Sequence, residues 1–262
     1  MALGAILHGQ TAVVTGAGRG LGRAIAVGLA QAGASVWICA RTVSELQTTA
    51  DLVQAAGGVA RVRPIDIGDD AACRGLVDDI TVEAGPIDIL VNNAAVLDLL
   101  PLDQLSPAIW RRALAINLTA PYLLSTLVLP TMRRRGGSIV NVSSRAGVLP
   151  FANEAAYCAS KFGLEGFTRA VALELAGCPI SINTVTPGLR IKPTSITDDD
   201  VVRGGVAGAG EWHDPALLIE AFVFLAALRG EISGQRFDAQ KLCAVLATAP
   251  NPTADAVLEI AE

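Results

Sequence analysis

Residues 11–22 of this sequence read Thr11-Ala12-Val13-Val14-Thr15-Gly16-Ala17-Gly18-Arg19-Gly20-Leu21-Gly22, and this stretch decides the fold. Its first five residues predict a short buried strand, its glycines a turn, and the run from Arg23 to Ala32 a helix. Glycines at 16, 20 and 22 let the backbone approach a phosphate group closely. The N–H groups and the dipole of the helix start favour negative charge, so the stretch predicts a phosphate-binding turn.

The spacing of these glycines is G-x-x-x-G-x-G, which differs from the usual G-x-G-x-x-G dinucleotide fingerprint. Leu21 occupies the place of the third glycine in that fingerprint. A turn that only packs the strand against the helix is the alternative interpretation, but the flanking elements favour the binding site. The residues expected to contact a dinucleotide here are Gly16, Arg19, Gly20, Leu21 and Gly22.

The second predicted strand, residues 35–40, ends where a Rossmann fold normally places an acidic residue on the adenosine ribose. No acid occurs between Ala34 and Ser44, and Arg41 follows the strand instead. The guanidinium groups of Arg41 and Arg19 could bind the 2′-phosphate of NADP through charge-assisted hydrogen bonds. We therefore expect NADP(H) as the favoured cofactor and NAD(H) as a possible one. The alternative for Arg41 is an ordinary solvated arginine at a strand end.

Two further predicted strands, residues 59–65 and 87–91, also end in residues suited to a cofactor site. Asp66 follows the first of them, where a carboxylate can meet an adenine amino group. Residues 92–95, Asn-Asn-Ala-Ala, follow the second and are small residues where a cofactor would pass, although Asn pairs also mark ordinary turns. The cofactor-binding residues expected here are Asp66, Ile67, Asn93 and Ala94.

A second motif, Tyr157-Cys158-Ala159-Ser160-Lys161, places a phenol and an ammonium one turn apart on one face of a predicted helix. A tyrosine titrates near a pKa of about 10, and a neighbouring lysine charge lowers that pKa, so the pair can act as a general acid/base. A half-buried tyrosine beside a solvated lysine is the alternative. The strand predicted at 138–142 brings Ser144 to the same sheet edge, within reach of the phenol.

The remaining sequence continues the alternation of strands and helices. Asn117 lies among apolar neighbours in a helical region from about residue 107 to 135, as either a structural kink or part of a polar relay. Strands are predicted at 180–185 and 235–237, a helix at 215–228, a substrate loop at about 189–214 and a tail at about 240–262. We therefore predict one α/β domain over residues 1–262, a doubly wound, seven-stranded parallel sheet.

The amino-acid composition limits the classes of partner that the protein is expected to bind. The 262 residues are 52% hydrophobic and 17% charged, with a net charge of -5. This balance gives no general attraction for nucleic acid or an anionic membrane, so we expect a small-molecule substrate instead. Five scattered cysteines without a C-x-x-C pair suggest neither a disulfide framework nor a metal site, and the N-terminus lacks the pattern of a signal peptide. A cytoplasmic, soluble protein is the expectation.

Taken together, the sequence resembles the compact, single-domain branch of the short-chain dehydrogenase/reductase family over about residues 8–239. The motifs that carry the resemblance are Thr15-Gly16-x-x-x-Gly20-x-Gly22, Asn92-Asn93-Ala94, Asn117, Ser144, Tyr157-x-x-x-Lys161 and Pro187-Gly188. The resemblance implies a hydride transfer between a nicotinamide cofactor and an alcohol or carbonyl group. It also implies a seven-stranded parallel Rossmann sheet and a homodimer or homotetramer.

The resemblance also implies a role for each matching residue. Tyr157 would donate the proton to a carbonyl oxygen, or act as base in the oxidative direction, and Ser144 would hydrogen-bond that oxygen. Lys161 would lower the tyrosine pKa and hold the nicotinamide ribose, while Asn117 would keep a water-filled proton relay in place. The residues implied to cover the nicotinamide are Pro187, Gly188 and Ile191. No metal is required.

Three alternatives stay open from the sequence. One is an NAD(H)-preferring alcohol or sugar dehydrogenase of the same fold, and another is a nucleotide-binding sensor that has lost catalysis. A nucleotide-sugar epimerase or dehydratase is disfavoured because it needs a larger C-terminal substrate domain. The substrate is not readable, since Val148, Leu149 and Phe151 predict an apolar pocket whereas Arg145 and Arg190 could favour an anionic group.

Overall fold

The structure, a computed structural model, describes residues 5–192, 212–249 and 252–261. A seven-stranded sheet with the order β3-β2-β1-β4-β5-β6-β7 forms its centre, and every neighbouring pair is parallel. The strands are β1 (Thr11–Thr15), β2 (Ser35–Ala40), β3 (Val59–Pro64), β4 (Ile89–Asn92), β5 (Gly137–Val142), β6 (Ile180–Thr186) and β7 (Arg236–Asp238). Each predicted strand overlaps one of these, so the predicted fold class is confirmed.

The strand order reverses between β1 and β4, and this reversal positions the site. The chain runs outward from β1 through β2 to β3, then crosses back so that β4 pairs with the other side of β1. In open parallel sheets a ligand crevice forms beyond the carboxyl ends of the strands at such a reversal. The glycine turn follows β1 and residues 93–96 follow β4, so both border this crevice.

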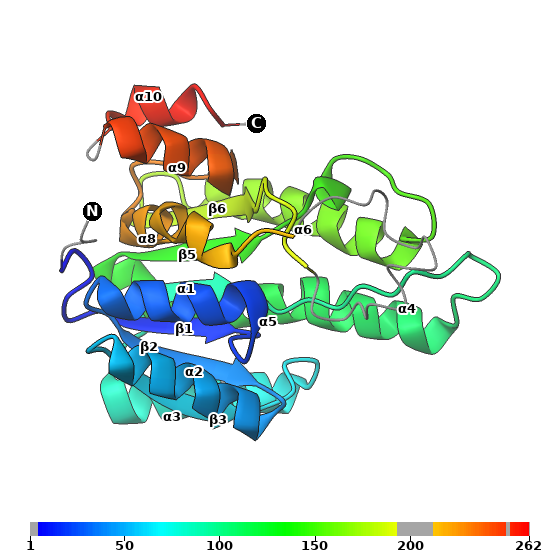
Figure 1. The fold of residues 1–262 in the computed structure, drawn as a ribbon, viewed down its shortest axis with the longest axis horizontal. Helices are drawn as coiled ribbons and strands as arrows, with labels where there is room; N and C mark the ends of the chain where they lie inside the picture. Colours follow the sequence, from blue (N-terminus) through cyan, green and yellow to red (C-terminus); the bar gives the residue numbers. More distant parts are fainter. Residues whose placement is uncertain (1–4, 193–211, 250–251, 262) are drawn as a thin grey trace.

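Helices cover both faces of the sheet (Figure 1). They are α1 (Gly20–Gln31), α2 (Val43–Ala55), α3 (Asp70–Ala84), α4 (Pro107–Leu114), α5 (Ala120–Arg135), α6 (Ala155–Glu174), α8 (Ile219–Ala227), α9 (Ala239–Thr248) and α10 (Ala254–Leu258), with the short helices η1 (Ala115–Thr119), η2 (Arg145–Gly147) and η3 (Pro215–Leu218). On one face α1, α2 and α8 bury one apolar cluster against the sheet, and on the other face α3 and α5 bury a second. Two such layers are what a doubly wound sheet requires.

The helical region predicted from 107 to 135 is present but not uniform. It consists of α4, the π-helical η1 and α5, and Asn117 lies within the π-helical part. By length and composition alone Pro107–Arg135 could cross a membrane, yet half of its most apolar window is buried inside the domain. Core helices of soluble proteins have the same property, so this helix is weak evidence for a membrane span.

The C-terminal segment differs from the predicted tail. Residues 239–248 form α9 and residues 254–258 form α10, and Leu242, Leu246 and Val257 are buried in the cluster on the α1 face. These apolar side chains contribute to the core, so the segment is a packed part of the domain. Of the predicted substrate loop, residues 193–211 lie outside the described residues.

Candidate functional site

The glycine turn meets the geometric demands of a phosphate site. Gly16 has a φ of +65°, in the left-handed region, and a Cβ at Gly22 would lie 2.3 Å from the carbonyl oxygen of Gly16. Only glycine therefore fits at either position without a backbone shift. Among the described residues no side chain caps the start of α1, where Arg19 occupies the N-cap position, and its first turn holds no acidic residue. The N–H groups of this helix start thus favour an anion.

Side chains from β1 and from the end of β4 hold this turn in shape. The Thr15 hydroxyl accepts hydrogen bonds of 3.0 Å from the backbone N–H groups of Asn93 and Ala94. The Asn93 side-chain amide donates to the carbonyl oxygens of Thr15, at 2.8 Å, and Gly16, at 3.3 Å. Asn93 therefore positions the turn through its side chain, and the sequence did not reveal the matching role of Thr15.

The crevice continues along β2 to an arginine-rich end. Arg41 follows β2 and is exposed, and no hydrogen bond or ion pair joins its guanidinium to another residue in the described part of the chain. Arg19 forms an ion pair with Glu45 of α2, with 3.2 Å between Nη1 and Oε1. Arg41, Arg19 and Glu45 all line the same cleft. This end of the cleft thus contains an acidic side chain, Glu45, that the sequence reasoning missed.

Asp66 also lies on this side, beyond β3. One of its carboxylate oxygens accepts a hydrogen bond of 2.9 Å from the Gly68 N–H, which fixes a tight turn. The side chain is exposed and lines the cleft together with Ile67. The predicted adenine-side pair is therefore at the cleft, although part of the hydrogen-bonding capacity of Asp66 is used within its own turn.

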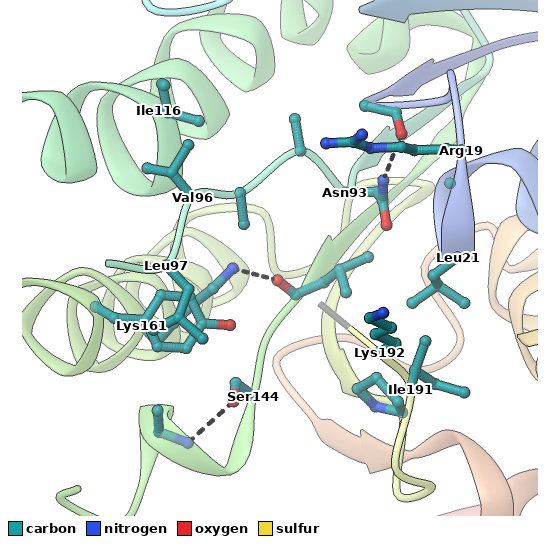
Figure 2. A pocket seen from close by; sticks show the side chains of 18 of the residues that line it. Arg19, Leu21, Asn93, Val96, Leu97, Ile116, Ser144, Lys161, Ile191 and Lys192 are labelled. Carbon is teal, nitrogen blue, oxygen red and sulfur yellow. Dashed lines mark hydrogen bonds between the residues drawn. The ribbon is translucent and has the colours of Figure 1, made fainter. Parts of the chain in front are cut away.

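Tyr157 and Lys161 lie on the first two turns of α6, at the other end of the cleft. The Lys161 side chain is 2% exposed, and its ammonium donates a 2.7 Å hydrogen bond to the carbonyl oxygen of Val142 at the end of β5 (Figure 2). The same nitrogen lies 5.7 Å from the centroid of the Tyr157 ring. The two side chains thus share one face of the helix, as their spacing predicted.

Burial dominates the protonation of this pair. It raises the pKa of Tyr157 to about 12, an effect that a hydrogen bond with Ser144 opposes and the Glu154 charge reinforces. It also lowers the pKa of Lys161 to about 8, against the raising effect of Glu165. The sequence-based expectation of a lowered tyrosine pKa is therefore wrong, because desolvation of the phenolate outweighs the lowering effect of the hydrogen bond with Ser144. Tyr157 holds its proton at neutral pH.

Ser144 precedes the short helix η2, which directly follows β5. Its hydroxyl oxygen accepts a hydrogen bond of 3.2 Å from the Ala146 N–H, and it interacts with the Tyr157 phenol. The cap therefore fixes the direction of the hydroxyl, which faces the cleft opposite Lys161 (Figure 2). Ser144 and Tyr157 are therefore neighbours, as the sequence predicts.

Asn117 is fully buried, and its amide is used by the protein itself. Its Oδ1 accepts from the Val96 N–H at 2.8 Å, while its Nδ2 donates to the Val96 carbonyl oxygen at 2.9 Å and to the Ser160 hydroxyl at 3.0 Å. The amide thus attaches the segment after β4 to α6 and satisfies its own polar atoms. Of the two alternatives left open by the sequence, the π-helical distortion and these contacts support a structural role, and the proton relay stays a prediction.

These elements enclose one continuous cleft of about 670 Å³. The predicted residues that line it are Gly16, Arg19, Leu21, Gly22, Arg41, Asp66, Ile67, Asn93, Ala94, Ser144, Tyr157, Lys161, Pro187, Gly188 and Ile191. Gly20, the first residue of α1, is not among the described residues that line the cleft, and the buried Asn117 contacts the cleft wall through its hydrogen bonds to Val96. In Figure 2, Arg19 and Asn93 lie at the upper right of the view, Lys161 and Ser144 at the lower left, and Leu21 and Ile191 at the right. Cofactor and catalytic predictions therefore converge on one site.

Several residues that belong to none of the sequence motifs also line the cleft near Tyr157. Leu97, Leu99 and Phe151 supply apolar surface, and Glu154 lies three residues before Tyr157 with a pKa raised by burial. Arg145 stacks on Phe151, with its guanidinium carbon 5.5 Å from the ring centroid. Among the described residues, no group of three or more His, Cys, Asp or Glu side chains is arranged to hold a metal ion.

The family of the chain follows from comparison with known proteins. The family model described as short chain dehydrogenase matches residues 10–200. The chain belongs to this family. It is 34% identical to the D-threitol dehydrogenase of Mycolicibacterium smegmatis over 84% of this chain and 86% of that protein. It is also 36% identical to a short chain dehydrogenase of Pseudocercospora fijiensis, over 74% of this chain and 64% of the relative.

A solved structure agrees with this assignment. A metagenomic short-chain oxidoreductase, crystallised in complex with NADP, superposes with a TM-score of 0.75 at 35% identity. The match covers 87% of this chain and 95% of that one. The protein is therefore a short-chain dehydrogenase/reductase, an enzyme that acts on alcohol or carbonyl groups. The resemblance inferred from the motifs is confirmed.

Proposed function

We propose that the protein is an NADP(H)-dependent oxidoreductase that interconverts a ketone or aldehyde and an alcohol, with Tyr157 as the general acid/base. The observation that carries the proposal is that Tyr157, Lys161 and Ser144 line the same cleft as the uncapped, glycine-rich start of α1. A dinucleotide bound with its phosphates at that helix start would lie in the same cleft as Tyr157, Lys161 and Ser144.

The protonation state of Tyr157 suits it to act as a proton donor. A nicotinamide cofactor held in this cleft would supply the hydride for the carbonyl carbon, and the protein would have to provide a proton for the carbonyl oxygen. Tyr157 keeps its proton at neutral pH because burial raises its pKa to about 12, so it can donate that proton. The Ser144 hydroxyl, held by its bond to Ala146, donates to the same oxygen. Lys161, fixed on Val142, stabilises the resulting phenolate.

The preference for NADP(H) rests on the arginine-rich end of the cleft. Arg41 is exposed next to β2 and Arg19 is the N-cap residue of α1, and both line the cleft, so both guanidinium groups can reach a 2′-phosphate. Glu45 opposes this preference, since its carboxylate is paired with Arg19 in the same region. The match to a structure crystallised with NADP supports the proposal at the level of the family.

The alternative within the same reaction class is an NAD(H)-preferring alcohol or sugar dehydrogenase. The similarity to a D-threitol dehydrogenase favours it, and so does Glu154, because a half-buried carboxylate beside Tyr157 can accept hydrogen bonds from substrate hydroxyls. A sensor that has lost catalysis has no need of a buried lysine beside Tyr157, and burying that charge costs stability. The catalytic proposal is therefore preferred over the sensor.

We also propose a cytoplasmic location and a small-molecule substrate as the functional setting. The described structure contains five free cysteines, two of them fully buried, and a reducing compartment keeps such thiols intact. The net charge of -5 supports a small-molecule partner over nucleic acid.

The proposal is tested with a panel of ketones, polyols, sugars and acyl thioesters, with NADPH oxidation or NADP reduction followed by absorbance. The expected result is turnover of at least one carbonyl compound with NADPH, and slower turnover with NADH at equal concentration. Turnover of polyols with NAD alone supports the alternative. A protein that binds NADPH but turns over no compound in either direction contradicts the catalytic proposal.

A further inference from the structure

A buried ion pair lies directly behind the catalytic residues. Glu165 follows Lys161 by one turn of α6, and Arg236 lies on β7, 71 residues further along the chain. Their side chains form a direct ion pair, and the residues are 5% and 2% exposed. Charges removed from water to this degree are costly, and an apolar pair of the same volume is often as stable or more so. The pair therefore calls for an explanation beyond stability.

Polar contacts connect this pair to strand β6 and to the turn after β5. The Glu165 carboxylate accepts hydrogen bonds from the Ser143 hydroxyl at 2.5 Å and from the Thr184 hydroxyl at 2.7 Å. Nη1 of Arg236 also donates to the Ser143 hydroxyl oxygen at 3.4 Å. Nη2 of Arg236 donates to the backbone carbonyl oxygen of Ser144 at 3.2 Å. The network thus joins α6, β6 and β7 to Ser143 and Ser144, the two residues of the turn after β5.

The turn that carries Ser144 packs closely against the ion pair of Glu165 and Arg236. A Cβ at Gly147, the last residue of η2, would lie 2.8 Å from the Ser143 hydroxyl oxygen and 3.1 Å from Cγ of Glu165. The turn that carries Ser144 therefore packs directly on the ion pair. Any displacement of Glu165 or Arg236 moves this turn, and with it the hydroxyl that faces Tyr157.

We propose that Glu165 and Arg236 are positioning residues for the reaction. Glu165 acts through the charge of Lys161, and Arg236 acts through the backbone of Ser144. This inference rests on the proposed roles of Lys161 and Ser144 in catalysis. Glu165 keeps a negative charge one turn below Lys161, and Arg236 holds that carboxylate in place while it anchors Ser144. Neither side chain lines the cleft, so neither contacts the substrate.

The charged and titratable groups around Lys161 come from several elements. Tyr157 and Glu165 lie on its own helix, Arg236 approaches Glu165 from β7, and the Val142 carbonyl of β5 accepts from the ammonium. Burial lowers the pKa of Lys161 to about 8, and Glu165 acts against this effect. Loss of the Glu165 charge is therefore expected to lower the pKa further, so that less of Lys161 is charged at neutral pH.

The direct test is an NMR titration, which requires neither substrate nor cofactor. The chain contains three lysines, Lys161, Lys192 and Lys241, so ¹³C-labelled lysine gives three side-chain signals, and the Lys161→Met variant assigns one of them. We expect the Lys161 signal to titrate about one pH unit lower in Glu165→Gln than in the parent. Glu174→Gln removes the same charge from an exposed position at the end of α6 and should leave the titration unchanged. An unchanged Lys161 titration in Glu165→Gln overturns the role of Glu165.

The role of Arg236 is tested with a variant designed to fold. Glu165→Met with Arg236→Met replaces the ion pair by two apolar side chains of similar volume, a change that leaves no unpaired buried charge. We expect this double variant to fold and to bind NADPH within about threefold of the parent, with kcat reduced by about tenfold or more because Ser144 loses its anchor. A folded double variant with parental kcat and parental pH profile overturns the proposal. If the parent itself turns over no carbonyl compound, the proposed function fails, whereas the lysine titration still decides the part that concerns Glu165.

Discussion

Lys161 donates a 2.7 Å hydrogen bond from its buried ammonium to the carbonyl oxygen of Val142, the last residue of β5. The contact fixes the lysine on the sheet edge, beneath the cleft and one turn from Tyr157. A single carbonyl does not replace the water that a charged ammonium loses on burial, which is why the pKa of Lys161 falls to about 8. The lysine therefore changes charge close to neutral pH.

The first prediction concerns stability against pH. The pKa of Lys161 is about 8 in the folded protein and 10.5 for the unperturbed group, so the unfolded chain binds more protons between these values. Stability from this residue therefore rises with pH across that window. The buried thiols of Cys39 and Cys73, whose pKa values are raised to about 12 and about 11, act in the opposite sense. The useful quantity is thus the difference between the parent and Lys161→Met.

We expect the free energy of unfolding of the parent, relative to Lys161→Met, to rise by about 1 kcal/mol between pH 8 and pH 9. Denaturant unfolding at several pH values, with equal slopes in the two proteins, measures this difference. A difference that is constant over this range shows that the lysine is not titrating in the folded state near pH 8.

The second prediction concerns the 2′-phosphate of NADP. Arg41→Ala should weaken NADPH binding by about 1.5–3 kcal/mol, the range for a hydrogen bond to a charged group, and leave NADH binding almost unchanged. Fluorescence titration with each cofactor measures the two affinities. Arg74→Ala, a change of the same kind on α3 away from the cleft, serves as the control. Equal losses for both cofactors rule out a phosphate contact by Arg41.

The third prediction concerns Glu45, whose carboxylate lies at the same end of the cleft and pairs with Arg19. Glu45→Gln removes a negative charge that repels a 2′-phosphate and competes for Arg19. Because the pair is partly exposed, we expect a modest gain of about two- to fivefold in NADPH affinity, with little change for NADH. Asp51→Asn removes the same charge from an exposed position further along α2 and should have no effect. A stronger gain for NADH than for NADPH contradicts this assignment of Glu45.

The fourth prediction is self-association through α5 and α6. Tyr122 on α5 and Phe162 and Leu173 on α6 are 51%, 45% and 80% exposed, although all three are large apolar side chains. Burial of such side chains against a second copy is favourable. We expect light scattering at micromolar concentration to give the mass of a dimer or tetramer, and Phe162→Asp to lower it. Val82→Asp, at an exposed position on α3, is the matched control, and a monomeric parent contradicts the prediction.

The sequence predicted the architecture because local patterns carry it. The apolar strands, the glycine turn and the Tyr157–Lys161 spacing each depend on residues close together in the chain, and the structure has all of them. The sequence predicts only a tail at about 240–262, because the packing partners of α9 lie on α8 and η3, which no local pattern indicates. The same limit applies to Arg236 and Glu165, which are separated by 71 positions.

The electrostatics were the harder part to predict. The spacing of Tyr157 and Lys161 indicates a charge effect on the phenol, but the sign of the net pKa shift depends on how deeply the phenol is buried. That depth is set by surrounding elements and not by the motif. Glu45 was missed for a related reason, since its contact with Arg19 depends on how α2 packs beside the glycine turn. A carboxylate in the first turn of the helix after β2 is the sequence signal for such a contact.

The last prediction tests the proton transfer itself. Tyr157→Phe removes only the hydroxyl, and the ring still fills its place in the cleft wall, so folding and NADPH binding should survive. Turnover should fall by about 10²-fold or more, the scale typical of a lost general acid. The chain has only two tyrosines, so Tyr122→Phe, at an exposed position on α5, is the matched control and should keep parental turnover.

Lys161→Met should lower turnover and also weaken NADPH binding, because it removes both the charge that stabilises the phenolate and the proposed ribose contact. Cofactor affinity therefore separates the two variants. A Tyr157→Phe protein that binds NADPH and still reduces its best carbonyl substrate at the parental rate would show that this tyrosine is a packing residue, and that the proton comes from another group.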